Sequence, residues 1–119
     1  MKWNFALLAG FFFLFSCKTD DRIPKGIIGM RSMQLVTWDV MLADELALQR
    51  KFADSSIQLK NATSHLYDTV FAIHGITRDQ FYSSYRFYQN HPELYRKLMT
   101  GVKKIGEAEK KSLQPPSVQ

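Results

Sequence analysis

The stretch HGITRDQF, residues 74–81, predicts the boundary between two helices and sets the fold class of this chain. Thr77 and Gln80 have the spacing of a capping box, in which each side chain accepts a hydrogen bond from the backbone N–H of the other residue. The apolar residues on either side of this box have the spacing of a hydrophobic staple. Gly75 suits the left-handed conformation with which many helices end. One helix is therefore expected to end at this glycine, and another to begin directly after the cap.

Apolar residues at helical spacing on both sides of this turn predict four helices. Residues 106–119 are polar and contain two adjacent prolines, so we expect a disordered tail there. No alternating strand pattern and no internal repeat is present in the sequence. The predicted fold class is all-α, a small bundle of about four helices that is large enough for an independent core. The helices are expected over residues 32–51, capped by Ser32, and over residues 62–74, 78–89 and 92–105, with a loop over residues 52–61.

The first predicted helix is apolar around most of its circumference. Only a narrow strip around Thr37 and Asp44 is polar. A helix of this kind is normally surrounded by others, so we expect it to be the central helix of a domain over residues 32–105. Two adjacent arcs are apolar, with Leu35, Val36, Leu42, Ala43 and Leu46 on the first and Trp38, Met41 and Leu48 on the second.

Asp39 lies in the middle of the first arc. A carboxylate among apolar side chains is costly unless it is paired or hydrogen-bonded. We therefore predict that Asp39 is a structural polar anchor with a specific partner on a later helix, namely a tyrosine hydroxyl, a histidine or an arginine. The alternative is a catalytic acid, because burial raises the pKa of a carboxyl group and such groups cluster at functional sites.

Residues 1–16 have the features of a signal peptide, which targets a protein and is then removed. A short positive start, MKWN, precedes an apolar run from Phe5 to Phe15. As a helix, this run rises only about 16 Å, roughly half of what a bilayer core requires. We therefore expect the run to target the chain and not to span a membrane.

The end of that run, LFSC at residues 14–17, resembles the lipobox of bacterial lipoproteins. The resemblance implies cleavage between Ser16 and Cys17, with a diacylglycerol and an acyl chain attached to Cys17. Cys17 is the only cysteine, and acylation accounts for an unpaired thiol in an exported chain. Two or three acyl chains hold a protein firmly on a membrane. The alternative is a simple secretory leader followed by an incidental cysteine.

Residues 17–31 form the predicted lipidated tether between this cysteine and the bundle. Lys18, Asp20 and Asp21 resemble the export signal of surface lipoproteins in Bacteroidota, which implies a lipid anchor in the outer membrane, on its periplasmic face or at the cell surface. The alternative for these charges is a solvated linker. The isoleucines at 27–28 are too apolar for a free spacer and are expected to lie against the bundle. The domain then sits close to the membrane.

The chain from Cys17 to Lys104 resembles a lipoprotein family of Bacteroidota that is known only as a domain of unknown function, number 4296. The resemblance implies location and architecture, and it implies nothing about activity because its motifs are mostly fold signals. It rests on Cys17, on Pro24 with Ile27-Ile28, on residues 33–45 around Asp39, on His74-Gly75-Ile76-Thr77 with Gln80-Phe81 and Ser84, and on Tyr88 before Pro92-Glu93.

Two classes of function receive little support from the sequence. Residues 66–88 resemble a DNA-binding helix-turn-helix, and the net charge of +5 with a pI of about 9.4 agrees with it. However, Lys2 leaves with the leader, and an exported protein does not meet the chromosome, so no nucleic acid is expected as a partner. A small envelope enzyme that uses Asp39 is the other alternative.

For an enzyme, the candidate bases are His65, His74 and His91. Nine residues separate the first two, about 180° around a helix, so they cannot form a helical ligand pair. His74 beside Gly75 is better explained as a C-terminal residue that interacts with the helix dipole. We therefore expect no catalytic residue, no metal and no cofactor apart from the lipid on Cys17.

The favoured hypothesis is a non-catalytic interaction module that is anchored to an envelope membrane. Its fourth helix and tail are basic, which suits anionic lipid headgroups or an anionic surface polymer, although a solvated face is the alternative. Tyr82 and Phe87 are the candidate exposed aromatic residues for contact with an envelope protein. The basic residues are Arg96, Lys97, Lys103, Lys104, Lys110 and Lys111.

Overall fold

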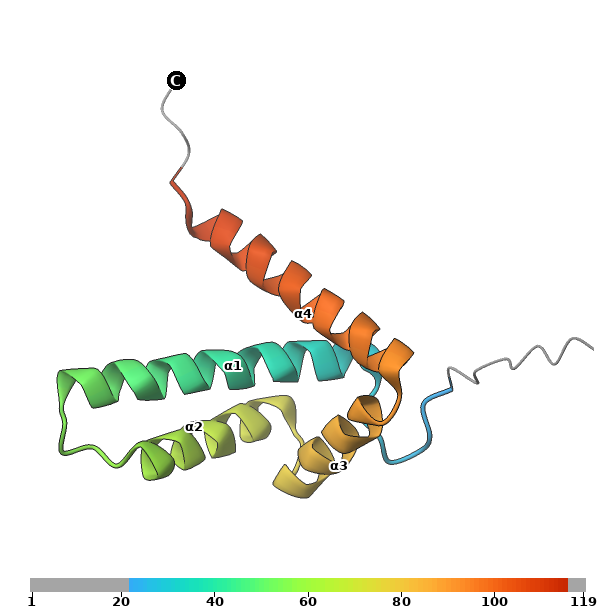
Figure 1. The fold of residues 1–119 in the computed structure, drawn as a ribbon, viewed down its shortest axis with the longest axis horizontal. Coiled ribbons are helices and arrows are strands. Elements are labelled where there is room, and N and C mark those ends of the chain that lie inside the picture. The colour runs from blue at the N-terminus through green and yellow to red at the C-terminus, as the bar shows by residue number, and fades with distance from the viewer. Residues whose placement is uncertain (1–21, 116–119) are drawn as a thin grey trace, which may run out of the picture.

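The computed structural model describes residues 22–115, and within that range the chain forms four α-helices and no strand (Figure 1). The all-α prediction is therefore confirmed. The elements are α1 (Met30–Ala53), α2 (Leu59–His74), α3 (Arg78–Gln89) and α4 (Pro92–Leu113). None of these helices combines the length and hydrophobicity of a membrane-spanning segment.

Helix α1 contacts both of the other long helices. It packs against α2 in an antiparallel hairpin and against the first half of α4, and the short α3 connects α2 to α4 (Figure 1). Helices α1 and α4 start at the same end of the molecule and diverge toward their C-termini (Figure 1). The C-terminal half of α1 therefore has one neighbouring helix, α2, which lies along one of its sides.

The turn between α2 and α3 has the geometry that residues 74–81 predict. Gly75 adopts φ 64° and ψ 32°, and the N–H of Ile76 donates to the carbonyl of Phe71 at 3.0 Å. The hydroxyl of Thr77 accepts from the N–H of Gln80 at 3.1 Å, and Oε1 of Gln80 accepts from the N–H of Thr77 at 2.9 Å. The capping box is complete, and α3 has its predicted bounds.

The ends of the first two helices differ from the prediction. Ser32 is not a cap, because α1 begins two residues earlier after Gly29, which provides no side-chain cap. Helix α2 begins at Leu59, so the loop is shorter than expected. Within that loop, Oδ1 of Asp54 accepts from the hydroxyl of Ser56 at 2.7 Å and from its N–H at 2.9 Å. These bonds lower the pKa of Asp54.

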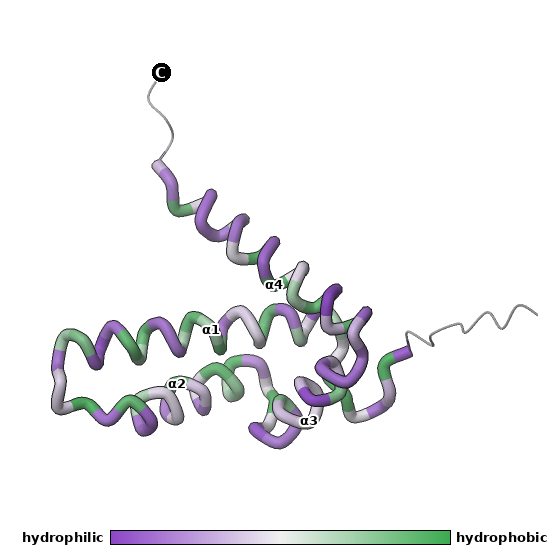
Figure 2. The backbone as a smooth tube through the Cα atoms, in the orientation of Figure 1, coloured by the Kyte–Doolittle hydropathy of each residue, from purple (hydrophilic) through white to green (hydrophobic). Residues whose placement is uncertain are grey.

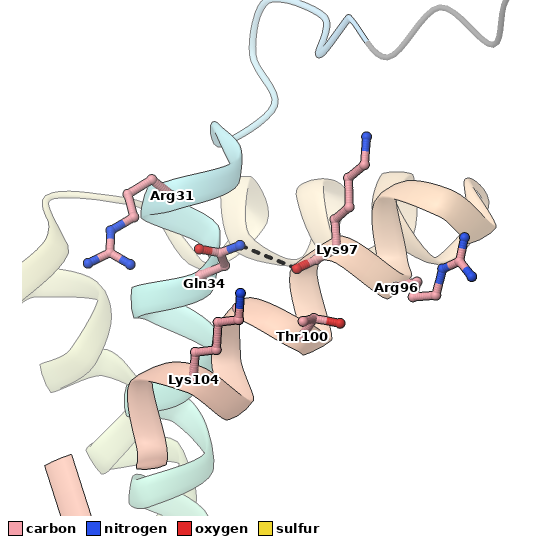
Figure 3. A pocket seen from close by; sticks show the side chains of 7 residues that line it. Arg31, Gln34, Arg96, Lys97, Thr100 and Lys104 are labelled. Carbon is pink, nitrogen blue, oxygen red and sulfur yellow. Dashed lines mark hydrogen bonds between the residues drawn. The ribbon is translucent and has the colours of Figure 1, made fainter. Parts of the chain in front are cut away.

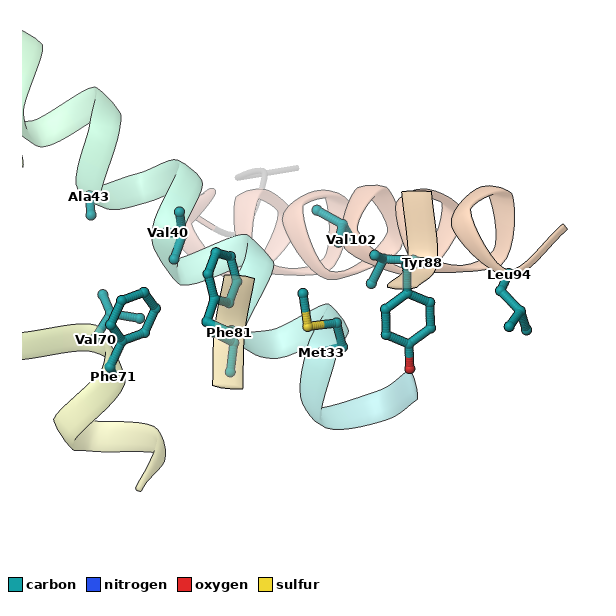
Figure 4. Close-up of a cluster of buried hydrophobic side chains, with 11 residues drawn as sticks. Met33, Val40, Ala43, Val70, Phe71, Phe81, Tyr88, Leu94 and Val102 are labelled. Atoms are coloured by element: carbon teal, nitrogen blue, oxygen red, sulfur yellow. The ribbon is translucent and has the colours of Figure 1, made fainter. Parts of the chain in front are cut away.

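The core is a single cluster of buried side chains to which all four helices contribute (Figure 4). On α1 the buried residues are mostly small, which allows α2 and α4 to approach closely. The prediction for the faces of α1 was right for Val36 and Ala43 of the first arc, which are buried, and wrong for its leucines. The buried stripe also includes Thr37, from the narrow strip that was predicted to be polar. The core residues are Met33, Val36, Val40, Ala43, Val70, Phe71, Phe81, Tyr88, Leu94, Leu98 and Val102.

The long aliphatic side chains of α1 lie outside this core. Leu35, Leu42 and Leu46 are 36%, 40% and 39% exposed, and Met41 and Leu48 are exposed on another side of the helix. Figure 2 shows hydrophobic residues recurring along the whole of α1, including its C-terminal half. Because α4 diverges from α1, the helices of the described part leave these leucines partly uncovered.

The predicted tail is helical over most of its length, because α4 continues to Leu113. Trp38 of α1 holds this extension. Its indole lies against Gly106, where a Cβ atom would come within 2.7 Å of the ring, and its Nε1–H donates to Oε2 of Glu109 at 2.5 Å. The disordered tail and the domain end at residue 105 were therefore wrong predictions for residues 106–113. Residues 116–119 lie outside the described part of the chain.

Candidate functional site

The tether is fastened to the bundle where it enters α1. Ile23, Ile27 and Ile28 pack against the core, as expected for Ile27 and Ile28. The N–H of Ile28 donates to Oγ of Ser84 at 2.9 Å, and the hydroxyl of Tyr88 donates to the carbonyl of Ile28 at 2.7 Å. Ser84 and Tyr88 are fully buried. Burial raises the pKa of Tyr88. These contacts fix residues 23–28 to α3.

The residues assigned to cleavage, lipidation and export lie outside the described residues. They are Ser16, Cys17, Lys18, Asp20 and Asp21.

Asp39 is paired with the last residue of α2. Its Oδ2 lies 2.6 Å from Nε2 of His74, and the Asp39 and His74 side chains are 42% and 19% exposed. A histidine from a later helix is one of the three partners named from the sequence. The expected burial of Asp39 is found only in part, because its side chain and the leucines of its arc remain partly exposed. The pair joins α1 to α2 at one edge of their interface.

A second polar contact, which the sequence reasoning missed, lies at the opposite edge of the same interface. The hydroxyl of Tyr67 donates to Oδ1 of Asp44 at 2.8 Å. Burial and this bond to a carboxylate raise the pKa of Tyr67. Asp44 belongs to the narrow strip of α1 that was predicted to be polar, and a carboxylate on an otherwise apolar helix was the signal available.

The other two histidines are not brought near Asp39 by any described contact. Nδ1 of His91 lies 2.6 Å from the carbonyl of Phe87, and the two rings have centroids 4.2 Å apart. His65 is exposed on α2. Within residues 22–115, His, Cys, Asp and Glu side chains do not gather in groups of three or more that could hold a metal ion.

The two candidate contact aromatics differ in exposure. Tyr82 is 40% exposed, with its ring edge-on to Phe81. Phe87 is half-buried, because it packs against the core and lies edge-on to Tyr88. The expectation that Phe87 is exposed was therefore wrong, and of these two candidates only Tyr82 is available at the surface.

An open hollow of about 460 Å³ lies where α1 and α4 meet (Figure 3). The Gln34 side chain lies on Gly101, and its Nε2 donates to the carbonyl of Lys97 at 3.3 Å. Three of the basic residues named from the sequence line this hollow, and Arg31 and Gln34 were missed. A glycine inside an otherwise regular helix was the signal for the close approach. The lining residues are Arg31, Gln34, Arg96, Lys97, Thr100, Gly101 and Lys104.

A second hollow, which is mostly apolar, lies between the diverging parts of α1 and α4. Trp38 and Leu42 line it from α1, and Gly106 and Leu113 line it from α4. Leu113 is 78% exposed. This hollow continues the uncovered leucine side of α1.

The family model described as Domain of unknown function (DUF4296) matches residues 24–112, which include all of the fastened tether except Ile23 and all of α4 except its last residue. No curated protein and no solved structure gives a significant match to the chain. The match spans most of the sequence and coincides with the folded part described above. The chain therefore belongs to the family described as Domain of unknown function (DUF4296).

Proposed function

We propose that the protein is a lipoprotein anchored in the outer membrane through acylated Cys17, and that its helical bundle is a non-catalytic module that binds another envelope protein. The observation that carries this proposal is the fastened tether. Five residues separate Cys17 from Ile23, where the described chain first packs against the core. Such a segment spans at most about 20 Å. An acylated Cys17 would hold the bundle beside the lipid headgroups, without a long free linker.

The uncovered side of α1 supports a protein as the partner. Leu35, Leu42 and Leu46 recur at intervals of seven and four residues and are each more than a third exposed. Neighbouring exposed apolar residues on a small domain mark surfaces for protein contact. The partner that fits is an envelope protein with an apolar helix face, since a helix face matches this spacing.

Labelling cells with a fatty acid tests the anchor. The native protein should take up the label and fractionate with membranes, and the Cys17→Ser variant should do neither. A variant with a substitution at Ser112, which is exposed and far along the chain, serves as a matched control for expression. An unlabelled native protein would exclude the lipoprotein proposal.

Crosslinking in intact cells tests the partner surface. A photoreactive residue at position 46 should give one adduct of defined mass, whereas the same residue at exposed position 60 on α2 should not. The Leu42→Lys substitution should abolish the adduct from position 46 while helical circular dichroism stays unchanged. An adduct that persists with Leu42→Lys would show that this side of α1 is not the contact surface.

A further inference from the structure

We propose that the basic hollow between α1 and α4 binds the phosphate group of an anionic lipid headgroup. This inference rests on the proposed anchoring at Cys17, because the anchor is what brings the hollow to a membrane. It adds a second membrane contact, a phosphate site on the bundle, which anchoring through Cys17 does not itself require.

The first argument is charge. Arg31 comes from α1, and Arg96, Lys97 and Lys104 come from α4, so four cationic side chains line one hollow. No aspartate or glutamate is among its lining residues. Glu93 pairs with Arg96 at the rim. Arg31 and Lys104 stand on either side of the Gln34 amide, and an anion bound between these two like charges lowers their repulsion. Guanidinium and ammonium groups together are the usual partners of phosphate oxygens.

The second argument is shape. A Cβ atom at position 101 would overlap the end of the Gln34 side chain, so glycine is what allows this amide to lie flat on α4 as the floor of the hollow. In Figure 3 the Lys104 side chain rises beside Gln34, with Arg31 on the other side of that amide. The hydroxyl of Thr100 adds a further donor to the lining. The lining thus brings hydrogen-bond donors from both helices to the two sides of the Gln34 amide.

The third argument is position. Arg31 is the second residue of α1 and follows directly after the fastened tether. The exposed Lys25 lies within that tether and adds positive charge at the same end of the bundle. An acylated Cys17 would therefore place this end of the molecule next to the headgroups, where each basic side chain adds to membrane attraction. The lipid headgroup is the phosphate source that this position favours.

Vesicle binding of the chain from residue 17 onward, carrying Cys17→Ser, tests the proposal without the contribution of the anchor. The chain should co-sediment with vesicles of phosphatidylglycerol and phosphatidylcholine, and much less with phosphatidylcholine alone. Each charge removed near a membrane weakens binding about 5-fold, so Arg31→Gln with Lys104→Gln should lower the partition coefficient about 25-fold. Lys110→Gln with Lys111→Gln removes the same charge from the far end of α4 and should lower it only about 2-fold. Equal losses for the two pairs would overturn the proposal.

Gly101→Ala separates the shape of the hollow from its charge. The added methyl group pushes Gln34 into the hollow and leaves every charge in place, so vesicle binding should fall while helical circular dichroism is retained. Unchanged binding would mean that only net charge matters, and the site would be refuted.

Soluble anions distinguish the sources of phosphate. Inorganic phosphate should shift the amide resonances of Thr100 and Gly101 only weakly, because it lacks the neighbouring headgroups. Saturation by inorganic phosphate at a concentration that leaves vesicle binding unaffected would overturn the lipid assignment. The lipid assignment would also be overturned if a carboxylated polysaccharide bound as tightly as the vesicles and lost this binding with Gly101→Ala. These outcomes are independent of the fatty-acid labelling, so the anchor and the hollow can fail separately.

Discussion

Alanine should be tolerated at one glycine of α4 and should destabilise the fold at another, and this prediction tests how α4 is held on α1. At Gly106 an added Cβ would lie 2.7 Å from two atoms of the Trp38 ring. That ring is also held by its hydrogen bond to Glu109. At Gly101 the added Cβ would meet only the end of the Gln34 side chain, which can rotate away.

The magnitudes follow from these neighbours. Alanine is favoured over glycine inside a helix by about 1 kcal/mol at both positions. Gly101→Ala breaks one exposed hydrogen bond of Gln34, which costs about 0.5 to 1 kcal/mol, so its net effect on the free energy of unfolding should be close to zero. Gly106→Ala must displace a rigid ring, which costs about 1 to 3 kcal/mol, and it breaks the bond to Glu109 at about 1 kcal/mol more. We expect Gly106→Ala to be the less stable variant by about 2 kcal/mol.

Urea unfolding followed by helical circular dichroism measures both variants. The sequence has two tryptophans, Trp3 and Trp38, so in a chain that starts at residue 17 the fluorescence reports on the displaced ring directly. Gly106→Ala should shift the emission to longer wavelength, and Gly101→Ala should leave it unchanged. A Gly106→Ala variant that is as stable as Gly101→Ala, with unchanged emission, would refute the packing of Trp38 on α4.

Three further outcomes are expected. Thr77→Ala should lower the free energy of unfolding by about 1 kcal/mol through loss of the capping box, as measured by urea unfolding, and Thr77→Ser should restore most of it. Asp39→Ala should cost about 0.5 to 1 kcal/mol, because the contact with His74 is partly exposed, and thermal unfolding that matches the parent chain would contradict this. A hydrogen bond to Tyr95, together with burial, raises the pKa of Tyr85 to about 12. The folded state thus favours the protonated hydroxyl of Tyr85. The contribution of this hydroxyl to stability is full below pH 10 and is lost as the pH rises toward about 12. In a circular dichroism titration, Tyr85→Phe should therefore show a shallower loss of helix at alkaline pH.

The helix boundary at residues 74–81 could be predicted because every interaction that forms it is local. The left-handed glycine, the reciprocal bonds of Thr77 and Gln80 and the start of α3 involve residues within a few positions of one another. No knowledge of the other helices is needed for such a turn. The four-helix architecture follows from the same kind of short-range pattern.

The buried face of α1 could not be predicted, because it depends on which helices lie beside it. Hydrophobicity favoured the two apolar arcs, but of the first arc only Val36 and Ala43 are buried. Close packing against α2 and α4 selected Val40 and Ala47, which lie on neither arc. The prediction that residues 106–113 are disordered failed for the same reason. The polar composition of residues 106–113 indicated disorder, and only the contact with Trp38, far away in the sequence, shows what holds them.

The candidate sites, too, could be predicted only as far as they depend on residues close together in the sequence. A partner for Asp39 could be expected from the cost of an unpaired carboxylate, but its choice of His74 required the hairpin of α1 and α2. The basic residues of α4 were visible in the sequence. Their meeting with Arg31 in one hollow depends on two helices whose facing residues lie more than sixty positions apart.

The measurement that tests the central claim most directly is the intact mass of the protein purified from its native membrane. The account predicts a chain that begins at Cys17 and carries a diacylglycerol and an acyl chain on that residue. A chain that begins elsewhere, or one in which Cys17 keeps a free thiol, would contradict it.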